Sequence, residues 1–179
     1  MKKFLFYFAV TGWALALIVH LFSLADIDVT EKISFVWLLH LGIFVVWIPA
    51  VIDLSKNEEL KTYRRSGILN RAPFGSFSII FKQTPLWLNT IAIAGFFYAI
   101  INFLLFMFSQ HGTPSIKDGQ YILHNHGQLI RTLTEREYHH YKANDVRGFS
   151  GHWIAFYGIA AAILFPFKKS AVSEMESRH

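Results

Sequence analysis

Hydrophobic residues along this chain gather in four long runs that polar segments separate. The runs cover residues 4–24, 33–54, 85–108 and 149–167. A helix of about 18 or more apolar residues is long enough to cross a hydrocarbon core of roughly 30 Å. The pattern therefore predicts an all-α integral membrane protein with four transmembrane helices, in which residues 1–179 form a single membrane domain.

The composition agrees with a lipid-facing protein. Hydrophobic residues make up 53 % of the chain, charged residues 16 %, and the eighteen Phe and five Trp suit a surface with aromatic belts at its edges. The net charge of +5 would also suit a nucleic-acid-binding protein, but no basic stretch has the interleaved aromatic residues that stack on bases. We therefore expect the lipid bilayer as a partner and no nucleic acid.

The first apolar run admits two interpretations. Lys2 and Lys3 precede it, and Ser23 and Ala25 suit the small-x-small cleavage site of a secretory signal. The run is longer than a usual signal core of 7–15 residues, however, and it contains His20. We therefore favour an uncleaved first span.

The distribution of Lys and Arg among the polar segments predicts the orientation. Eleven lie before residue 4, in the 55–84 segment or after residue 167, whereas six lie in the other two polar segments. Cytoplasmic loops carry the excess of basic residues. Both termini and the 55–84 loop are therefore expected in the cytoplasm and the 109–151 loop outside it, in a bacterial-type inner membrane.

Two polar segments contain the signature of a helix N-terminus. Ser55 with Glu58, and Thr134 with Glu137, match the capping box, in which each side chain bonds to the backbone amide of the other residue. They predict a short helix in the cytoplasmic loop and a second helix over residues 135–143 of the outer loop.

The outer loop is also expected to contain a β-hairpin and a tight return into the bilayer. Residues 120–124 and 128–133 contain β-branched and aromatic side chains, and the segment 125–127 between them favours a turn. Further along, Gly148 and Gly151 predict a sharp turn where the fourth span begins, because glycine adopts backbone conformations closed to other residues. The loop is thus predicted to be a small α+β segment.

Histidine is concentrated in the outer loop. Five of the nine histidines lie between residues 119 and 153. His124 and His126 would point to the same face of a strand and suit a metal ion, whereas in a turn that geometry is lost. A solvated loop with several imidazoles is the simpler interpretation, and the chain has no HExxH zinc motif.

Three histidines, one of them already counted in the outer loop, approach the outer side of the bilayer from different spans. His20, His40 and His152 lie in the first, second and fourth runs, toward that side. Ionisable residues within a membrane are costly and often mark a function, and imidazoles from neighbouring helices can ligate haem or a transition metal. The alternative is that neutral imidazoles bond to backbone carbonyls or to one another.

Small residues repeat at spacings of three and four in the third and fourth spans, and such faces permit close helix contact. They are Ala92, Gly95 and Ala99 in the third span, and Ala155, Gly158 and Ala162 in the fourth. The two faces are expected to pack on each other or on a second copy of the chain.

The favoured function is a non-catalytic interaction or accessory subunit that uses the outer loop. The contact residues expected there are Tyr138, Tyr141, Arg147 and Trp153. The alternative is a haem- or metal-binding redox protein with ligands from the three membrane histidines. The absence of cysteine excludes thiolate sites and disulfides, and no nucleotide-binding motif is present. A transport role is less favoured, because the spans carry few charged residues and Asn102 is the one polar residue deep in the third.

Overall fold

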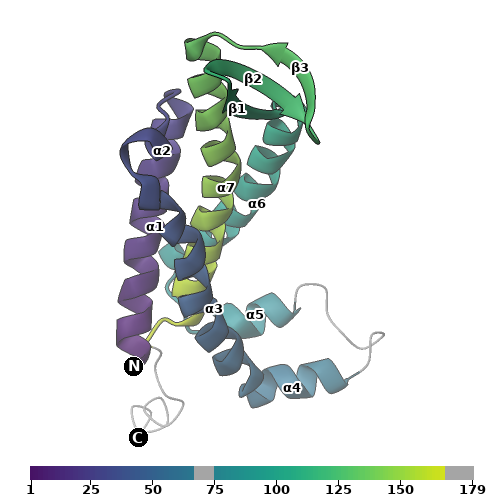
Figure 1. The fold of residues 1–179 in the computed structure, drawn as a ribbon. Coiled ribbons are helices and arrows are strands. Elements are labelled where there is room, and N and C mark those ends of the chain that lie inside the picture. Colours follow the sequence, from purple (N-terminus) through teal and green to yellow (C-terminus); the bar gives the residue numbers. More distant parts are fainter. Residues whose placement is uncertain (67–74, 168–179) are drawn as a thin grey trace, which may run out of the picture.

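The chain is mostly helical (74 %) in the computed structural model, which describes residues 1–66 and 75–167. Four long helices run along the molecule, with a small sheet at one end and the N-terminus at the other (Figure 1). These helices are α1 (Lys2–Leu24), α3 (Leu38–Ser55), α6 (Leu86–Ser109) and α7 (Glu135–Ile163).

Three helical stretches have the length and apolar composition of a membrane span. In the described part of the chain they are α1, α6 and Ser34–Ser55, where α3 continues from the short 3-10 helix η1 (Ser34–Trp37). Their bounds agree with the first three predicted spans to within two residues. These helices make the chain a candidate membrane protein, as the hydrophobic pattern indicated.

The α7 helix differs from the prediction, because it does not end at Ala143 and turn at the two glycines. It continues for 29 residues, from the outer loop into the fourth apolar run, which is about 43 Å at 1.5 Å per residue. The glycines instead permit close packing. A Cβ atom at Gly148 would lie 2.8 Å from the Phe106 ring, and one at Gly151 would lie 3.0 Å from Cγ of Asn102 and nearer still to its Nδ2. The predicted sharp re-entry was therefore wrong.

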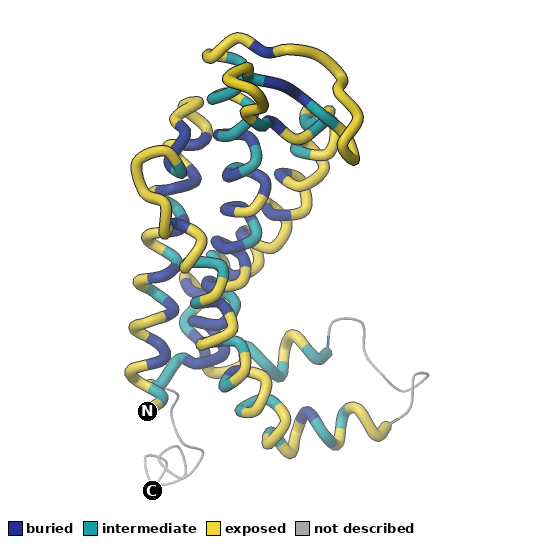
Figure 2. The backbone as a smooth tube through the Cα atoms, viewed as in Figure 1, coloured by how far each residue is buried: buried dark blue, intermediate teal, exposed yellow. Residues whose placement is uncertain are grey.

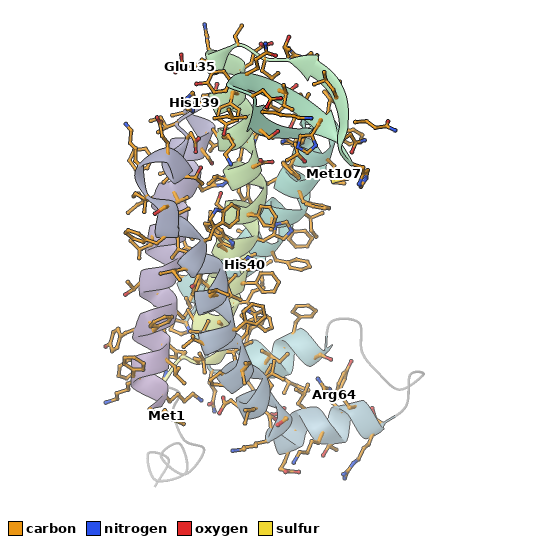
Figure 3. All side chains as sticks on the ribbon, in the orientation of Figure 1. Met1, His40, Arg64, Met107, Glu135 and His139 are labelled. Carbon is orange, nitrogen blue, oxygen red and sulfur yellow. The ribbon has the colours of Figure 1, made fainter. Side chains whose placement is uncertain are left out.

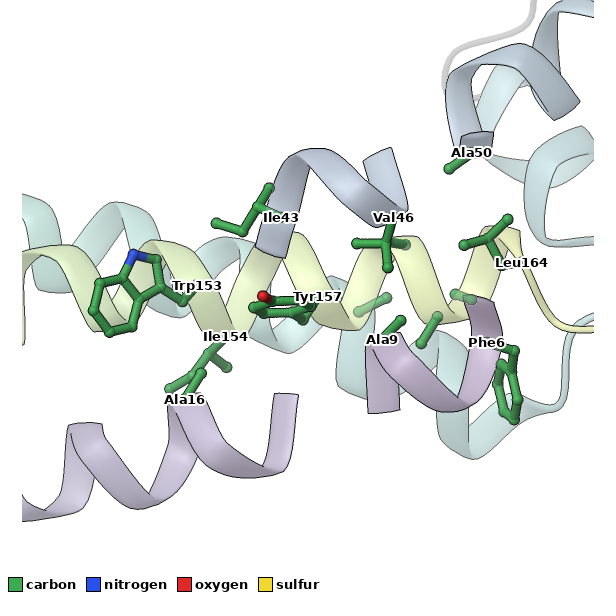
Figure 4. Close-up of a cluster of buried hydrophobic side chains, with 14 of the residues drawn as sticks. Phe6, Ala9, Ala16, Ile43, Val46, Ala50, Trp153, Ile154, Tyr157 and Leu164 are labelled. Atoms are coloured by element: carbon green, nitrogen blue, oxygen red, sulfur yellow. The ribbon is translucent and has the colours of Figure 1, made fainter. Parts of the chain in front are cut away.

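The hydrophobic core lies along α7. Helices α1, α3 and α6 all pack against it, and the side chains of Trp153 and Tyr157 are buried at its centre. Figure 4 shows Tyr157 of α7 close to Ile43 of α3, and Ile154 of α7 against Ala16 of α1. α7 is thus enclosed by the three apolar helices.

The outward faces of the surrounding helices are apolar as well. Figure 2 shows buried positions on the inward sides of the helices and exposed positions on the outward sides. Large hydrophobic side chains such as Phe4 of α1, Leu41 of α3 and Leu105 of α6 are exposed there. Exposed apolar bands of this extent are typical of helices that face lipid.

The two faces of small residues meet within the chain. Ala92 and Ala99 on α6 are buried, and a Cβ at Gly95 would lie 3.6 Å from the Cα of Ala155 on α7. A Cβ at Gly158 would lie 3.4 Å from the Trp13 ring of α1. The small residues therefore let α6 and α1 approach α7 closely.

Short helices occupy the two ends of the bundle. α2 (Val29–Lys32) lies toward the sheet, whereas α4 (Glu58–Arg65) and α5 (Gly75–Phe81) project sideways at the opposite end (Figure 1). Residues 67–74 between α4 and α5, which belong to the predicted cytoplasmic loop, lie outside the described part.

Only one of the two predicted capping boxes forms. Thr134 and Glu137 make the reciprocal bonds at the start of α7. α4 is capped instead by Asn57, whose side chain accepts from the Leu60 amide at 2.9 Å. Ser55 is still helical and its hydroxyl donates to the Ile52 carbonyl, so the prediction at Ser55 was wrong.

The outer loop contains a three-stranded antiparallel sheet. Its order is β1 (Thr113–Lys117), β2 (Gln120–Asn125) and β3 (Gln128–Thr132). The predicted hairpin between β2 and β3 is confirmed, with Gly127 at a φ of 85° in the turn. The sequence did not predict β1, which pairs with β2 and, like it, contacts α7.

Candidate functional site

A buried polar network joins α1, α6 and α7 below the sheet. His20 of α1 is 2 % exposed, its Nδ1 lies 2.8 Å from the hydroxyl of Ser150, and its Nε2 bonds to the hydroxyl of Tyr98. Both ring nitrogens are therefore engaged. His20 connects three helices and has no nitrogen free for a haem or metal.

The same network includes a shared backbone carbonyl. The carbonyl oxygen of Arg147 accepts from Nδ2 of Asn102 at 2.9 Å and from the hydroxyl of Ser150 at 3.3 Å. A polar group within an apolar bundle is costly unless it is hydrogen-bonded. Asn102 therefore links α6 to α7, and this contact accounts for the one polar residue deep in the third span.

Nearer to the sheet, a second cluster joins the end of α6 to α7. Nδ2 of Asn144 donates to Oε1 of Gln110 at 2.6 Å, and Nε2 of Gln110 donates to Oδ1 of Asp145 at 2.8 Å. A guanidinium nitrogen of Arg147 donates to the Ser109 hydroxyl at 3.3 Å. Burial raises the pKa of Asp145 to about 6, although Lys142 acts in the opposite direction.

Two histidines of α7 face the segment between α1 and α2. Nδ1 of His140 lies 2.9 Å from Oδ1 of Asp26, and Nδ1 of His139 lies 3.5 Å from Oδ2 of Asp28. Asp28 is buried and its other oxygen caps α2 through the Thr30 amide. The hydrogen bond of His140 therefore fastens this connection to α7, and His139 faces the Asp28 carboxylate.

The two candidate metal ligands of the hairpin are not arranged as a strand pair. His124 lies in β2, whereas His126 lies in the turn with a φ of 46°. The same-face geometry of a strand is therefore lost. Among residues 1–66 and 75–167, no group of three or more His, Asp or Glu side chains is placed to hold a metal ion.

His40 and His152 lie together on a hollow of about 260 Å³ between α3, α6 and α7. Nδ1 of His40 accepts from the indole nitrogen of Trp153 at 3.1 Å. Nδ1 of His152 lies 2.9 Å from the carbonyl oxygen of Gly148. His40 lies about halfway along the molecule (Figure 3). The structure thus brings these two candidate ligands to one hollow, and His20 does not line it.

The predicted contact residues of the outer loop are largely occupied within the chain. Tyr138 is half-buried and its ring packs against that of Tyr121, tilted by 37° with ring centroids 4.8 Å apart. Tyr141 and Arg147 are also half-buried, and Trp153 is 0 % exposed. Trp153 is therefore a core residue and offers no surface to a partner.

Much of the exposed surface of the outer loop lies on β3. All five residues of this strand are exposed, including Leu129 and Ile130, which are 61 % and 47 % exposed. Its β-branched content and the turn before it predicted the strand, and the sheet order β1-β2-β3 places it at an edge. A two-stranded hairpin leaves this edge of β3 free as well, and the addition of β1 makes β2 the central strand.

Comparisons with protein-family models, curated proteins and solved structures find no match for this chain.

Proposed function

We propose that the chain crosses a bacterial-type inner membrane four times, with both termini on the cytoplasmic side. We further propose that it acts as a non-catalytic interaction or accessory subunit. Its docking surface is the outer cap, defined here as β1, β2, β3 and the part of α7 before Gly148. The observation that carries the docking role is the free, apolar edge of β3.

The fourth crossing is supported by the environment of α7. The part from Phe149 onward is largely buried among α1, α3 and α6, three helices with the length and composition of spans. A helix enclosed by other helices contacts little lipid and tolerates more polar residues than a lipid-facing one. The excess of Lys and Arg on the side of the termini supports the orientation.

The edge of β3 suits a partner that adds an extended segment to the sheet. β3 pairs only with β2 within the described residues, so its outer edge offers unpaired backbone groups. Exposed edge strands attract further strands, and proteins usually block them. Backbone hydrogen bonds to such an edge supply affinity, and exposed side chains such as Leu129 supply specificity.

The docking role is tested by crosslinking in the native membrane. A photoreactive residue at Leu129 should give one discrete crosslinked product in intact membranes. A second photoreactive residue at Ile130 then reports the association in two variants. Leu129→Lys should abolish the crosslinked product. Gln128→Lys, which adds the same charge on the opposite face of the strand, should retain it. Crosslinking only to lipid, or equal loss in both lysine variants, would rule out docking through this strand.

The haem or metal alternative now depends mainly on His152. Its Nδ1 bonds to a backbone carbonyl, an arrangement that commonly orients a histidine ligand and leaves Nε2 free. His20 has both nitrogens engaged, and Nδ1 of His40 accepts from Trp153. An absorption spectrum and metal analysis of the purified protein test this alternative. A Soret band or near-stoichiometric metal that His152→Phe removes would support it over the accessory role.

A further inference from the structure

Three adjoining hollows follow α7 along α3, and two of them are also lined by α6. They are the hollow that holds His40 and His152 and one further hollow on each side. The hollow toward η1 measures about 490 Å³ and shares His40 and Phe149 with the central one. The hollow on the other side measures about 260 Å³ and shares Phe103, His152 and Phe156 with it. We call these three hollows the histidine groove.

The walls of the histidine groove are aromatic around both imidazoles. The ring of Phe103 meets His152 edge-on with centroids 5.3 Å apart, and Phe149 meets His40 at 6.1 Å. Phe106 and Phe156 complete the central hollow. Phenylalanine rings that surround a hollow favour edge-to-face contacts with the aromatic ring of a bound ligand.

The hydrogen bonds of His40 determine which of its nitrogens carries the proton. An indole N–H is a donor only, so Nδ1 of His40 must accept from Trp153 and therefore carries no proton. The proton of the imidazole must then be on Nε2. His40 presents an N–H donor on the side away from Trp153.

The hydrogen bond of His152 implies the opposite arrangement. A carbonyl oxygen accepts only, so Nδ1 of His152 must donate to Gly148 and carries the proton. In the neutral imidazole Nε2 is then an acceptor. Within the described chain neither Nε2 atom has a hydrogen-bond partner. The groove thus offers one unpartnered donor and one unpartnered acceptor.

A donor and an acceptor in an apolar groove are costly without a partner, and intramembrane polar groups often mark a binding function. A hydroxyl group satisfies both, because its proton goes to the acceptor and its oxygen accepts from the donor. The aromatic walls select a flat ring, and the apolar hollows on either side accommodate a hydrocarbon tail. An ionic headgroup has no counter-charge among the groove residues.

We propose that the histidine groove binds a lipid-soluble quinol. A phenolic hydroxyl of the quinol donates to Nε2 of His152 and accepts from Nε2 of His40, its ring lies among the phenylalanine rings, and its tail follows the groove. The site binds the quinol without a reaction, and it does not depend on docking at β3.

The first test compares three ligands on the unaltered protein. Decyl-ubiquinol, the corresponding quinone and the dimethyl ether of the quinol are titrated into the full chain in lipid nanodiscs, and binding is followed by ¹⁵N NMR of the histidine side chains. The quinol should shift the Nε2 resonances of His40 and His152. The ether, which cannot donate, should bind at least about tenfold more weakly, as expected for an acceptor left without its donor. The quinone should lose the shift at His152.

The second test uses variants that keep the ring volume. His152→Phe and His40→Phe should each weaken quinol binding by about tenfold or more, whereas His140→Phe in the outer cap should not change it. Helix content and the thermal midpoint confirm that each variant is folded. Equal affinity for quinol and ether, or unchanged affinity in both groove variants, would show that the groove takes up lipophiles without recognising the hydroxyl. A haem or metal bound at His152 in the purified protein would likewise overturn the proposal.

Discussion

Asp145 is a carboxylic acid whose surroundings favour the neutral form. It is half-buried near the sheet end of α7 and accepts from Nε2 of Gln110 at 2.8 Å. Burial raises its pKa from 3.8 to about 6. Since the folded pKa lies above the unfolded value, the folded state binds the proton more tightly, and its stability falls as the pH rises from about 4 to about 6. Above that range the loss of stability is constant.

Replacing Asp145 by Asn should therefore stabilise the protein at neutral pH. The amide oxygen of Asn can still accept from Gln110, while the cost of burying the charge disappears. We expect a gain of roughly 1–2 kcal/mol at pH 7.5, after discounting the shift for partial solvent exposure. The measurement is chemical unfolding in detergent as a function of pH. The gain should shrink as the pH falls toward 4, and a gain independent of pH would indicate a packing effect instead.

Gly151 of α7 lies directly against a polar side chain of α6. A Cβ there would lie 3.0 Å from Cγ of Asn102 and nearer still to its Nδ2, so Gly151→Ala must displace the side chain that donates to the Arg147 carbonyl. We expect a loss of about 1–3 kcal/mol, measured as a lower thermal midpoint in detergent.

Gly95 provides the matched control for that substitution. It is also a helical glycine at the α6–α7 contact, but its Cβ would meet Ala155 at an ordinary distance of 3.6 Å. Gly95→Ala should be neutral or slightly stabilising, because alanine favours the helix. If both substitutions were equally destabilising, the contact with Asn102 would not be the cause.

Among the elements, the long apolar helices were the most predictable from the sequence. Runs such as 85–108 are predominantly apolar, and lipid contact requires no particular partner, so composition alone marks α6. The extent of α7 depended on packing instead. Gly148 and Gly151 are compatible with a turn or with a close helix contact, and the sequence does not show which neighbour they meet. β1 was missed because it contains Pro114, which is tolerated in an edge strand.

The site was less predictable than the fold for a related reason. Positions along the chain predicted that His20, His40 and His152 lie at a similar depth in the bilayer. They did not show whether the three side chains point into the same space between the helices. The structure directs His20 to Ser150 and Tyr98, and only the other two line a common hollow. Which helices are neighbours, and how each helix is rotated, follows from side-chain packing that the apolar pattern does not encode.

The contrast between the two predicted capping boxes gives an element-scale prediction. Thr134→Ala removes a hydroxyl that accepts from the Glu137 amide at 3.2 Å, so α7 should lose about 1 kcal/mol of stability. Ser55→Ala should have little effect, because its hydroxyl bonds back to its own helix and caps nothing. Both variants are compared with the unaltered protein by thermal unfolding in detergent. Equal effects of the two substitutions would contradict the observed helix starts.

At the scale of the whole molecule, the sheet lies at one end of the bundle and α4 at the other (Figure 1). If α1, α3 and α6 each cross the membrane, these two ends lie in different compartments. The chain contains no cysteine, so single introduced cysteines report accessibility without background. Gln128 on β3, Thr62 on α4 and Phe167 beyond α7 are exposed positions that together test the orientation and the fourth crossing.

The labelling pattern of these three cysteines distinguishes the possible topologies. In cells with a permeable outer envelope, a membrane-impermeant maleimide should label Gln128→Cys directly, and should label Thr62→Cys and Phe167→Cys only after the inner membrane is opened. The excess of basic residues on the side of α4 is the physical reason for this orientation. Direct labelling of Thr62→Cys and Phe167→Cys, with Gln128→Cys protected until the membrane is opened, would reverse the orientation. Direct labelling of Phe167→Cys together with Gln128→Cys would mean that α7 does not cross, and the groove beside it would then need another explanation.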